Sequence, residues 1–147
     1  MKKYKLTNET ITVGSRTLYR IEALVELPGV SIGDKGGYIQ SEDNLSQVGN
    51  AWVYGNACVS DNACVSGNAC VSDNADIIWF SHVGSENGTL TVCKSKDGLQ
   101  VSRGCFFGTD SEFMEAVDTR HGLDSRIGKQ YSKLIAVARS RILGVDI

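Results

Sequence analysis

A six-residue repeat between residues 48 and 83 constrains the fold more strongly than any other feature of this sequence. From Tyr54 onward it reads YGNACV, SDNACV, SGNACV, SDNADI and IWFSHV. An aliphatic residue returns every six positions, and a small residue lies two positions before it. Since residues two apart in a strand share a face, we expect both to point inward. The aliphatic positions are Val53, Val59, Val65, Val71, Ile77 and Val83.

The residues between these pairs are suited to turns. Asparagine precedes each of the first five small residues, and Gly or Asp precedes each asparagine. Asparagine tolerates a positive φ better than most residues do, and Gly and Asp favour turns. Each hexad therefore predicts one short strand and one corner. Three hexads would complete a triangular turn of chain, stacked about 4.8 Å from the next turn. Such a short fixed period is typical of β-helices.

The hexads VSDNAC and VSGNAC resemble the hexapeptide-repeat family, whose fold is the left-handed parallel β-helix. The resemblance implies a mainly β protein. The run GDKGGYIQSEDNLSQVGNAWVYGNA also resembles bacterial and prophage hexapeptide-repeat proteins that are labelled as transferases or polymer-forming proteins. Because the family includes acyltransferases, carbonic-anhydrase-like proteins and inert scaffolds, the resemblance implies a fold and assigns no functional residue.

The repeat divides the chain into three predicted parts. Residues 1–29 are expected to form an N-terminal β-hairpin cap that turns at Gly14-Ser15. Residues 30–83 are expected to form the left-handed β-helix, and residues 84–147 a C-terminal ββαα module. Caps are expected because the terminal turns of a repeat structure expose apolar ends. In the irregular first turn of the β-helix, the residues expected to point inward are Val30, Ile32 and Ile39.

The C-terminal part carries signals for two strands. Asp97-Gly98 predicts a hairpin turn between strands at residues 89–95 and 100–107. The motif SRGCFFGT…EF…V…HG…Y…LI…R, which begins in the second strand, resembles a C-terminal module of phage and prophage proteins that have no assigned activity.

Two helices are predicted after these strands. Thr109 and Glu112 predict a capping box that opens a helix to about residue 120, and Gly122 ends it. A second helix is predicted over residues 124–143. Its apolar stripe consists of Ile127, Tyr131, Leu134, Ile135, Ala138 and Ile142.

Composition favours a cytoplasmic protein, in the host cytoplasm if it is phage-encoded. The net charge is −2, and no apolar run reaches membrane length. The lysine-rich start lacks the apolar core of a signal peptide, so the five cysteines are expected to be free thiols. Acidic residues outnumber basic ones between residues 30 and 83, which argues against direct nucleic-acid binding.

His82 is the candidate general base, because hexapeptide acyltransferases use a histidine in a cleft between subunits. The alternative is a surface histidine at the junction with the C-terminal module. Residues 18 apart should share a face, which would place Cys64 over His82 as a soft-metal or reactive-thiol pair. The alternative is an incidental pair, or a row of side chains buried against a partner subunit. Cys58, Cys64 and Cys70 should diverge on three faces, so no metal site is expected.

Four outward positions are apolar where a lone β-helix would be charged, and they favour a homotrimer packed face to face. These positions are Trp52, Cys58, Cys64 and Cys70.

In the C-terminal module, Arg103, Cys105 and His121 are the candidate site residues. A Cys105–His121 dyad would need spatial contact, and otherwise the cysteine fills the core while the histidine caps a helix. Trp79 and Phe80 are expected to plug the end of the β-helix, with a ligand pocket at that place as the alternative.

The first functional hypothesis is a non-enzymatic, homotrimeric binding or scaffold protein of phage or prophage origin that acts in counter-defence. It would sequester a small ligand, for example a host signalling nucleotide, or block a host protein. The alternatives are an acyltransferase that uses His82 as base and a structural self-assembling protein. No cofactor is expected, since no phosphate loop, carboxylate pair or serine triad is visible.

Overall fold

The computed structural model describes residues 2–96 and 98–147. Asp97, half of the predicted hairpin turn, lies outside the described residues. The strands are β1 (Tyr4–Val13), β2 (Arg16–Ala23), β3 (Lys35–Ile39), β4 (Trp52–Val53), β5 (Cys58–Val59), β6 (Cys70–Val71), β7 (Ile77–Val83), β8 (Gly88–Ser95), β9 (Gly98–Arg103) and β10 (Phe106–Thr109). The helices are η1 (Glu42–Asn44), η2 (Asn74–Asp76), α1 (Asp110–His121) and α2 (Arg126–Leu143).

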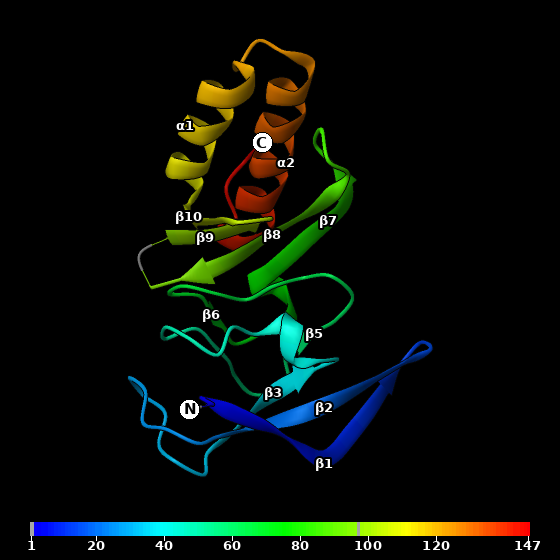
Figure 1. Cartoon of the computed structure of the whole chain (residues 1–147), viewed down its shortest axis with the longest axis vertical. Helices are drawn as coiled ribbons and strands as arrows, with labels where there is room; N and C mark the ends of the chain where they lie inside the picture. Colours follow the sequence, from blue (N-terminus) through cyan, green and yellow to red (C-terminus); the bar gives the residue numbers. More distant parts are fainter. Residues whose placement is uncertain (1, 97) are drawn as a thin grey trace.

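The elements lie in layers along the long axis of the molecule (Figure 1). β1, β2 and β3 lie at one end, and the short strands β4, β5 and β6 lie in the middle. The sheet that contains β7 to β10 comes next, and α1 and α2 cover its outer face at the other end.

The left-handed β-helix predicted for residues 30–83 is wrong, although the chain is mainly β as expected. Within the described residues the strands form three separate sheets, in the orders β1-β2-β3-β5, β10-β9-β8-β7 and β4-β6, and none of them closes. Parallel pairing there consists of two short strand contacts, Trp52-Val53 with Cys70-Val71 and Tyr38-Ile39 with Cys58-Val59, and one isolated bridge between Leu45 and Val65.

The repeat segment provides only some of its own hydrogen-bonding neighbours, and this explains the difference. β3 pairs in parallel with β5 on one edge but antiparallel with β2 on the other. The last hexad leaves the pattern altogether, because β7 pairs antiparallel with β8. Its bulky Trp79 and Phe80 favour an extended strand over a corner. The six-residue period therefore determines which side chains are buried, but it does not produce one continuous parallel sheet.

The predicted interior of residues 48–76, which we call the repeat segment, is confirmed over its first four hexads. Val53, Val59, Val65 and Val71 are fully buried, as are the alanines two positions before them. The pattern stops at Ala75, which is exposed where η2 begins. Val30 and Ile39 are buried as predicted, but Ile32 is 65% exposed and that expectation is wrong.

The corners of the repeat segment depend on the residue before each asparagine. Gly49, Gly55, Asp61 and Gly67 adopt φ values of 77°, 57°, 57° and 62°. These are left-handed conformations that glycine adopts without a steric penalty and Asp tolerates. Asp73, the fifth member, instead accepts a hydrogen bond from the Ala75 amide and caps η2. The Gly-or-Asp signal thus reports two kinds of turn.

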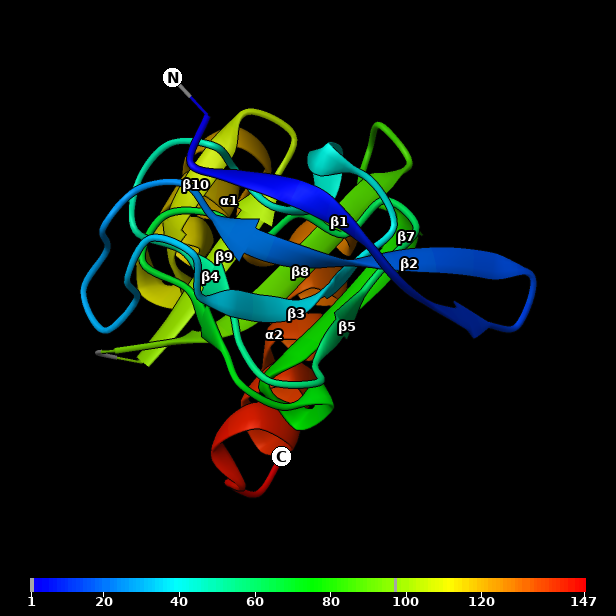
Figure 2. The same cartoon turned by 90° about the horizontal axis from the view of Figure 1, so that it is seen from below.

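The predicted N-terminal hairpin is confirmed, with β1 and β2 joined at Gly14-Ser15. Figure 2 shows that β1, β2 and β3 lie across one end of the repeat segment. Polar side chains satisfy the backbone there. The Gln47 side-chain oxygen accepts hydrogen bonds from the Lys3 and Tyr4 amides at 2.7 and 3.3 Å. The Tyr4 hydroxyl donates to the Leu45 carbonyl at 2.6 Å.

The C-terminal sheet has two different faces. One face covers the other end of the repeat segment, where the Thr91 hydroxyl accepts from the Cys64 amide at 3.1 Å and Cys93 joins the core of that segment. The opposite face packs its apolar side chains against the two α-helices. This second core contains Leu90, Val92, Leu99, Val101, Phe113, Val117, Tyr131, Ile135 and Ala138.

The predicted helices are confirmed closely, but the return strand is not. α1 begins with the Thr109–Glu112 capping box, and the buried residues of α2 belong to the predicted stripe, apart from Gly128. The single strand expected over residues 100–107 is wrong, because Gly104-Cys105 makes a turn between β9 and β10. Gly104 has φ 58°, which favours such a turn.

Neither α1 nor α2, the α-helices of the described residues, has the length and apolar character needed to cross a membrane. The cytoplasmic location stays a prediction.

Lys3 should make stability depend on pH. Its side chain is buried and donates to the Ala51 carbonyl at 2.7 Å, and burial lowers the pKa of its amine to about 8. Between about pH 8 and its ordinary value of 10.5, the unfolded chain keeps a proton that the folded chain has released. Unfolding then takes up a proton, so this residue's contribution to the free energy of unfolding rises with pH, by at most about 1.4 kcal/mol per unit.

Urea denaturation from pH 7.5 to 9.5 measures this effect. Burial raises the pKa values of the Cys64 and Cys93 thiols, which lowers stability over the same range, so the comparison is with a Lys3→Met variant. The free energy of unfolding of the wild type relative to Lys3→Met should rise with pH. Lys5→Met, which changes an exposed lysine, serves as the control and should follow the wild type. Parallel curves for the wild type and Lys3→Met would contradict the prediction.

Candidate functional site

A pocket of about 120 Å³ lies between the turn after β7, the β9–β10 hairpin and the two α-helices. We call it the arginine pocket. Its charged and polar lining comes from four separate elements, and its floor is aromatic. The polar lining residues include Glu86, Arg103, Arg120, His121 and Tyr131, and the apolar ones include Phe106, Phe113 and Val117.

Two glycines make room for Arg103 at the end of β9. A Cβ atom on Gly88 would lie 3.2 Å from the Arg103 guanidinium carbon. A Cβ atom on Gly84 would lie 2.0 Å from the Tyr131 hydroxyl oxygen and 3.1 Å from an Arg103 terminal nitrogen. Gly84 also has φ 76°, which other residues adopt at a cost. The backbone of the β7–β8 turn therefore approaches Arg103 and Tyr131 as closely as it does because these positions lack side chains.

The aromatic floor is built by the start of α1. The capping box fixes the helix directly after β10, which places Phe113 against Phe106 at a ring distance of 5.4 Å. Phe113 also meets Tyr131 of α2 edge-to-face at 5.0 Å. Such edge-to-face pairs are favourable beyond the area they bury, so they stabilise this arrangement of the floor.

Two arginines converge on one carboxylate at the pocket. Arg120 donates to one oxygen of Glu86 at 3.2 Å, and a terminal nitrogen of Arg103 lies 3.6 Å from the other oxygen. Arg103 also donates through Nε to the Tyr131 hydroxyl at 3.1 Å. The Arg103 side chain is only 14% exposed, whereas Glu86 and Arg120 are 59% and 69% exposed. The guanidinium of Arg103 is therefore the fixed charge of the site.

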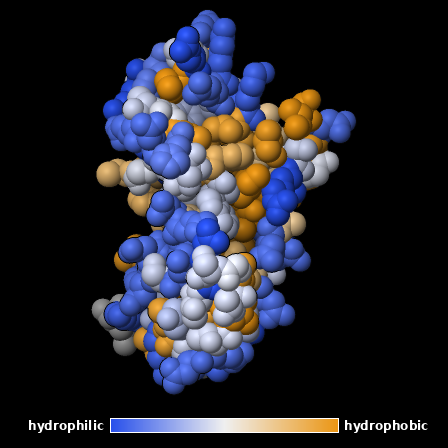
Figure 3. All heavy atoms as spheres, turned by 90° about the vertical axis from the view of Figure 1, so that its right-hand side faces the viewer, coloured by the Kyte–Doolittle hydropathy of each residue, from blue (hydrophilic) through white to orange (hydrophobic). Residues whose placement is uncertain are grey.

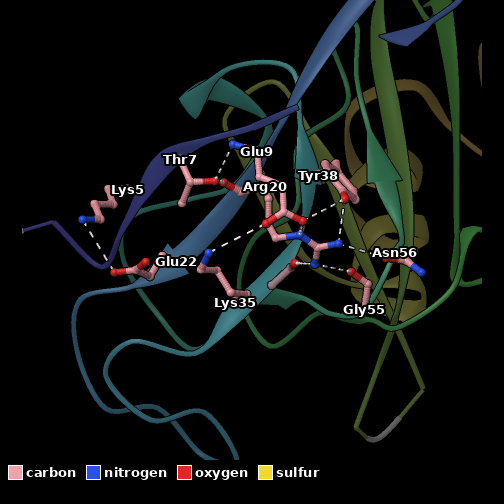
Figure 4. A network of polar contacts seen from close by, with 10 residues as sticks. Lys5, Thr7, Glu9, Arg20, Glu22, Lys35, Tyr38, Gly55 and Asn56 are labelled. Atoms are coloured by element: carbon pink, nitrogen blue, oxygen red, sulfur yellow. Dashed lines mark hydrogen bonds and ion pairs between the residues drawn. The ribbon is translucent and has the colours of Figure 1, made fainter. Parts of the chain in front are cut away.

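Arg20 shows what a fully satisfied arginine looks like in the same molecule (Figure 4). Its side chain is 15% exposed, close to the value for Arg103. Yet it makes five hydrogen bonds, to Glu9, Tyr38, Asn56 and the carbonyls of Gly36 and Gly55. In the part of the chain that the structure describes, Arg103 makes one. Arg20 therefore stabilises the N-terminal sheet, while Arg103 retains donors for another group.

The structure brings two of the predicted site residues into the arginine pocket and distributes the others. Arg103 and His121 line it. Cys105 is exposed in the β9–β10 turn and is not among the described residues that line it. Trp79 packs against the core of the repeat segment and Phe80 against the helical core. The two aromatic residues thus fasten β7 to both layers.

His82 and Cys64 line different surface depressions. His82 adopts φ 60° at the bulge of β7 and lies in a broad depression of about 620 Å³ beside Asp43 and Asp61. Cys64 borders a second depression with Thr91, and burial raises the pKa of its thiol, which disfavours the reactive thiolate. No hydrogen bond or ion pair of the His82 side chain occurs within the described ranges, and no metal-binding cluster does either.

The burial of Trp52 within the single chain weakens the case for a homotrimer. It was expected to face outward, but it is 1% exposed in the single chain and its ring meets Tyr4 edge-to-face at 6.2 Å. The predicted 18-residue register does place it opposite Cys70. Figure 3 shows apolar side chains gathered elsewhere, on one side of the half that holds the helices.

No pattern in the sequence indicates that Glu86, Arg120 and Tyr131 belong to a site. Residues 84–88 precede the first predicted strand of the C-terminal module, and Tyr131 belongs to a predicted apolar stripe. Two glycines four residues apart, facing an arginine in the next hairpin, are the signal that could have indicated the close approach. Comparison with family models and with curated proteins finds no match for this chain.

Gly84→Ala should be more destabilising than Gly104→Ala. Both glycines have positive φ, 76° and 58°, but an added Cβ meets nothing within 4 Å at Gly104. Gly104→Ala should cost about 1 kcal/mol from backbone strain, and Gly84→Ala about 1–3 kcal/mol more from overpacking against Tyr131. Urea denaturation measures both variants. Equal losses would mean that the close approach to Tyr131 has no energetic consequence.

Proposed function

We propose that the protein is a non-enzymatic binding protein that holds a small ligand in the arginine pocket. The observation that carries this proposal is the nearly buried Arg103, whose terminal nitrogens make no hydrogen bond among the described residues and border a cavity. Ligand sites typically combine an apolar floor with a few converging polar groups. The arginine pocket has both features, whereas the depressions lined by Lys129, Cys64 and His82 do not pair a nearly buried charge with aromatic walls.

The size of the pocket favours a ligand smaller than a nucleotide. Pockets that enclose drug-sized molecules measure about 300–1,000 Å³, whereas this one measures about 120 Å³. A signalling nucleotide would have to leave most of its surface outside. Sequestration of such a nucleotide at a subunit seam, a homotrimer, a phage origin and a host protein partner all stay predictions.

The acyltransferase alternative has one supporting observation, the polar depression beside His82. A general base must be oriented toward the proton that it abstracts. His82 is exposed, and no side chain of the described residues holds it by a hydrogen bond or ion pair. We therefore rank this alternative below ligand binding. Self-assembly predicts higher oligomers in mass photometry.

Ligand binding is tested with two small probes, benzoate and its neutral counterpart benzyl alcohol, in an NMR titration at pH 7.5. At least one should bind with a dissociation constant of about 0.1–10 mM, as expected for molecules of this size. The shifted backbone amides should lie around Phe113 and His121, which line the pocket.

The variant Ala116→Trp should abolish those shifts, because Ala116 is exposed at the pocket lining and a bulky ring there obstructs the cavity. Glu115→Trp adds the same ring at the adjacent exposed position, which does not line the pocket, and should bind like the wild type. If neither probe shifts the pocket amides, or if Ala116→Trp binds normally, the proposed function is wrong.

A further inference from the structure

We infer that the ligand is a small organic anion, and that its carboxylate replaces the Glu86 side chain between Arg103 and Arg120. This inference rests on the proposed function and specifies the chemistry of the same pocket. Glu86 then acts as an internal competitor that occupies the arginines when no ligand is bound.

The described residues use only one of the N–H donors of Arg103. A guanidinium has five N–H groups in a planar fork that matches a carboxylate. Arg20, equally buried, makes five hydrogen bonds, whereas Arg103 makes one among the described residues, through Nε. The nearest carboxylate oxygen lies 3.6 Å away, beyond a good hydrogen bond. The terminal N–H groups of Arg103 therefore remain free for a closer acceptor.

The Glu86 carboxylate lies where the carboxylate of a ligand would lie. Its carboxylate already spans the two guanidiniums, which shows that an oxyanion fits there. It is 59% exposed, and such solvated ion pairs change an equilibrium constant by no more than about fivefold. A ligand carboxylate can therefore displace it at little cost. A ligand that also filled the cavity would bind in preference to Glu86, which leaves the cavity empty.

Aromatic rings beside the arginines would contact the apolar part of the ligand. Phe106, Phe113 and Tyr131 present ring surfaces next to the arginines. A cavity of about 150 Å³ lined by apolar side chains holds benzene in an engineered protein, and the arginine pocket measures about 120 Å³. It therefore accommodates a body of a few carbons or most of one ring, whereas inorganic phosphate leaves the aromatic floor uncovered.

One feature opposes an anion. Arg120 and His121 end α1, and the carbonyl end of a helix carries about −0.5 of an elementary charge. The full positive charges of Arg103 and Arg120 outweigh it once Glu86 is displaced. The balance of charge at the pocket thus depends on whether Glu86 is present, which makes this residue the informative one to change.

The test is a calorimetric titration of benzoate, benzyl alcohol and inorganic phosphate at pH 7.5. The wild type should bind benzoate at least about tenfold more tightly than either of the other two. Glu86→Gln should tighten benzoate about twofold to fivefold, since the competitor loses its charge, and should leave benzyl alcohol unchanged. Arg120→Gln should weaken benzoate by about threefold or more. Glu115→Gln, an exposed change on the same helix outside the pocket, should match the wild type.

Three outcomes overturn the inference, and they differ from failure of the proposed function. Benzyl alcohol binding as tightly as benzoate would exclude the anion and leave small-ligand binding intact. Phosphate binding as tightly as benzoate would exclude the organic body. Benzoate binding that is unchanged or weaker in Glu86→Gln would exclude the competitor role. Failure of all three probes to bind would instead contradict the proposed function itself.

Discussion

Burial of the valines and alanines of the repeat segment is the constraint on which the rest of the structure depends. The segment is so short that the apolar surface at its two ends must be covered as well as the surface in its middle. Val53, Val59, Val65 and Val71 lose all contact with water only because other elements cover both ends. At one end Tyr4 packs on Trp52 and its hydroxyl satisfies a carbonyl, and at the other the C-terminal sheet supplies hydroxyl and amide acceptors. Each cover is thus an apolar surface with a few polar groups matched to exposed backbone.

The C-terminal sheet connects this constraint to the candidate site. Alternate residues of a strand point to opposite faces, so Thr91 and Cys93 face the repeat segment while Leu90 and Val92 face the helices. The same alternation fixes β9, whose last residue, Arg103, lies at the edge of the helical core. The pocket therefore depends on a sheet whose other face is anchored by the repeat.

The sequence predicted local features well and the partners of its strands poorly. The capping box at Thr109 and the hairpin at Gly14-Ser15 depend on neighbours a few residues away, and the six-residue period marks which valines point inward, so all three features were predicted. The sheets depend on which strand edges pair with each other. A hexad indicates only which side chains are apolar. Trp52 was misplaced for the same reason, because its cover comes from Tyr4, far away in the sequence. Glu86 could not be found, since charged residues in turns are usually solvated and have no pattern.

The contrast between Arg20 and Arg103 separates a structural arginine from a candidate site residue. Both are nearly buried, and desolvation of a charge is costly unless hydrogen bonds replace the lost water. Arg20 obtains that compensation within the N-terminal sheet, and its guanidinium also lies 4.4 Å from the Tyr38 ring centre. Arg103 obtains one hydrogen bond and a loose, solvated carboxylate. Two glycines leave room for this guanidinium, and Tyr131 accepts one hydrogen bond from it. Most of its donors are unused by the described residues. An anion that binds there explains this arrangement better than the stability of the fold does.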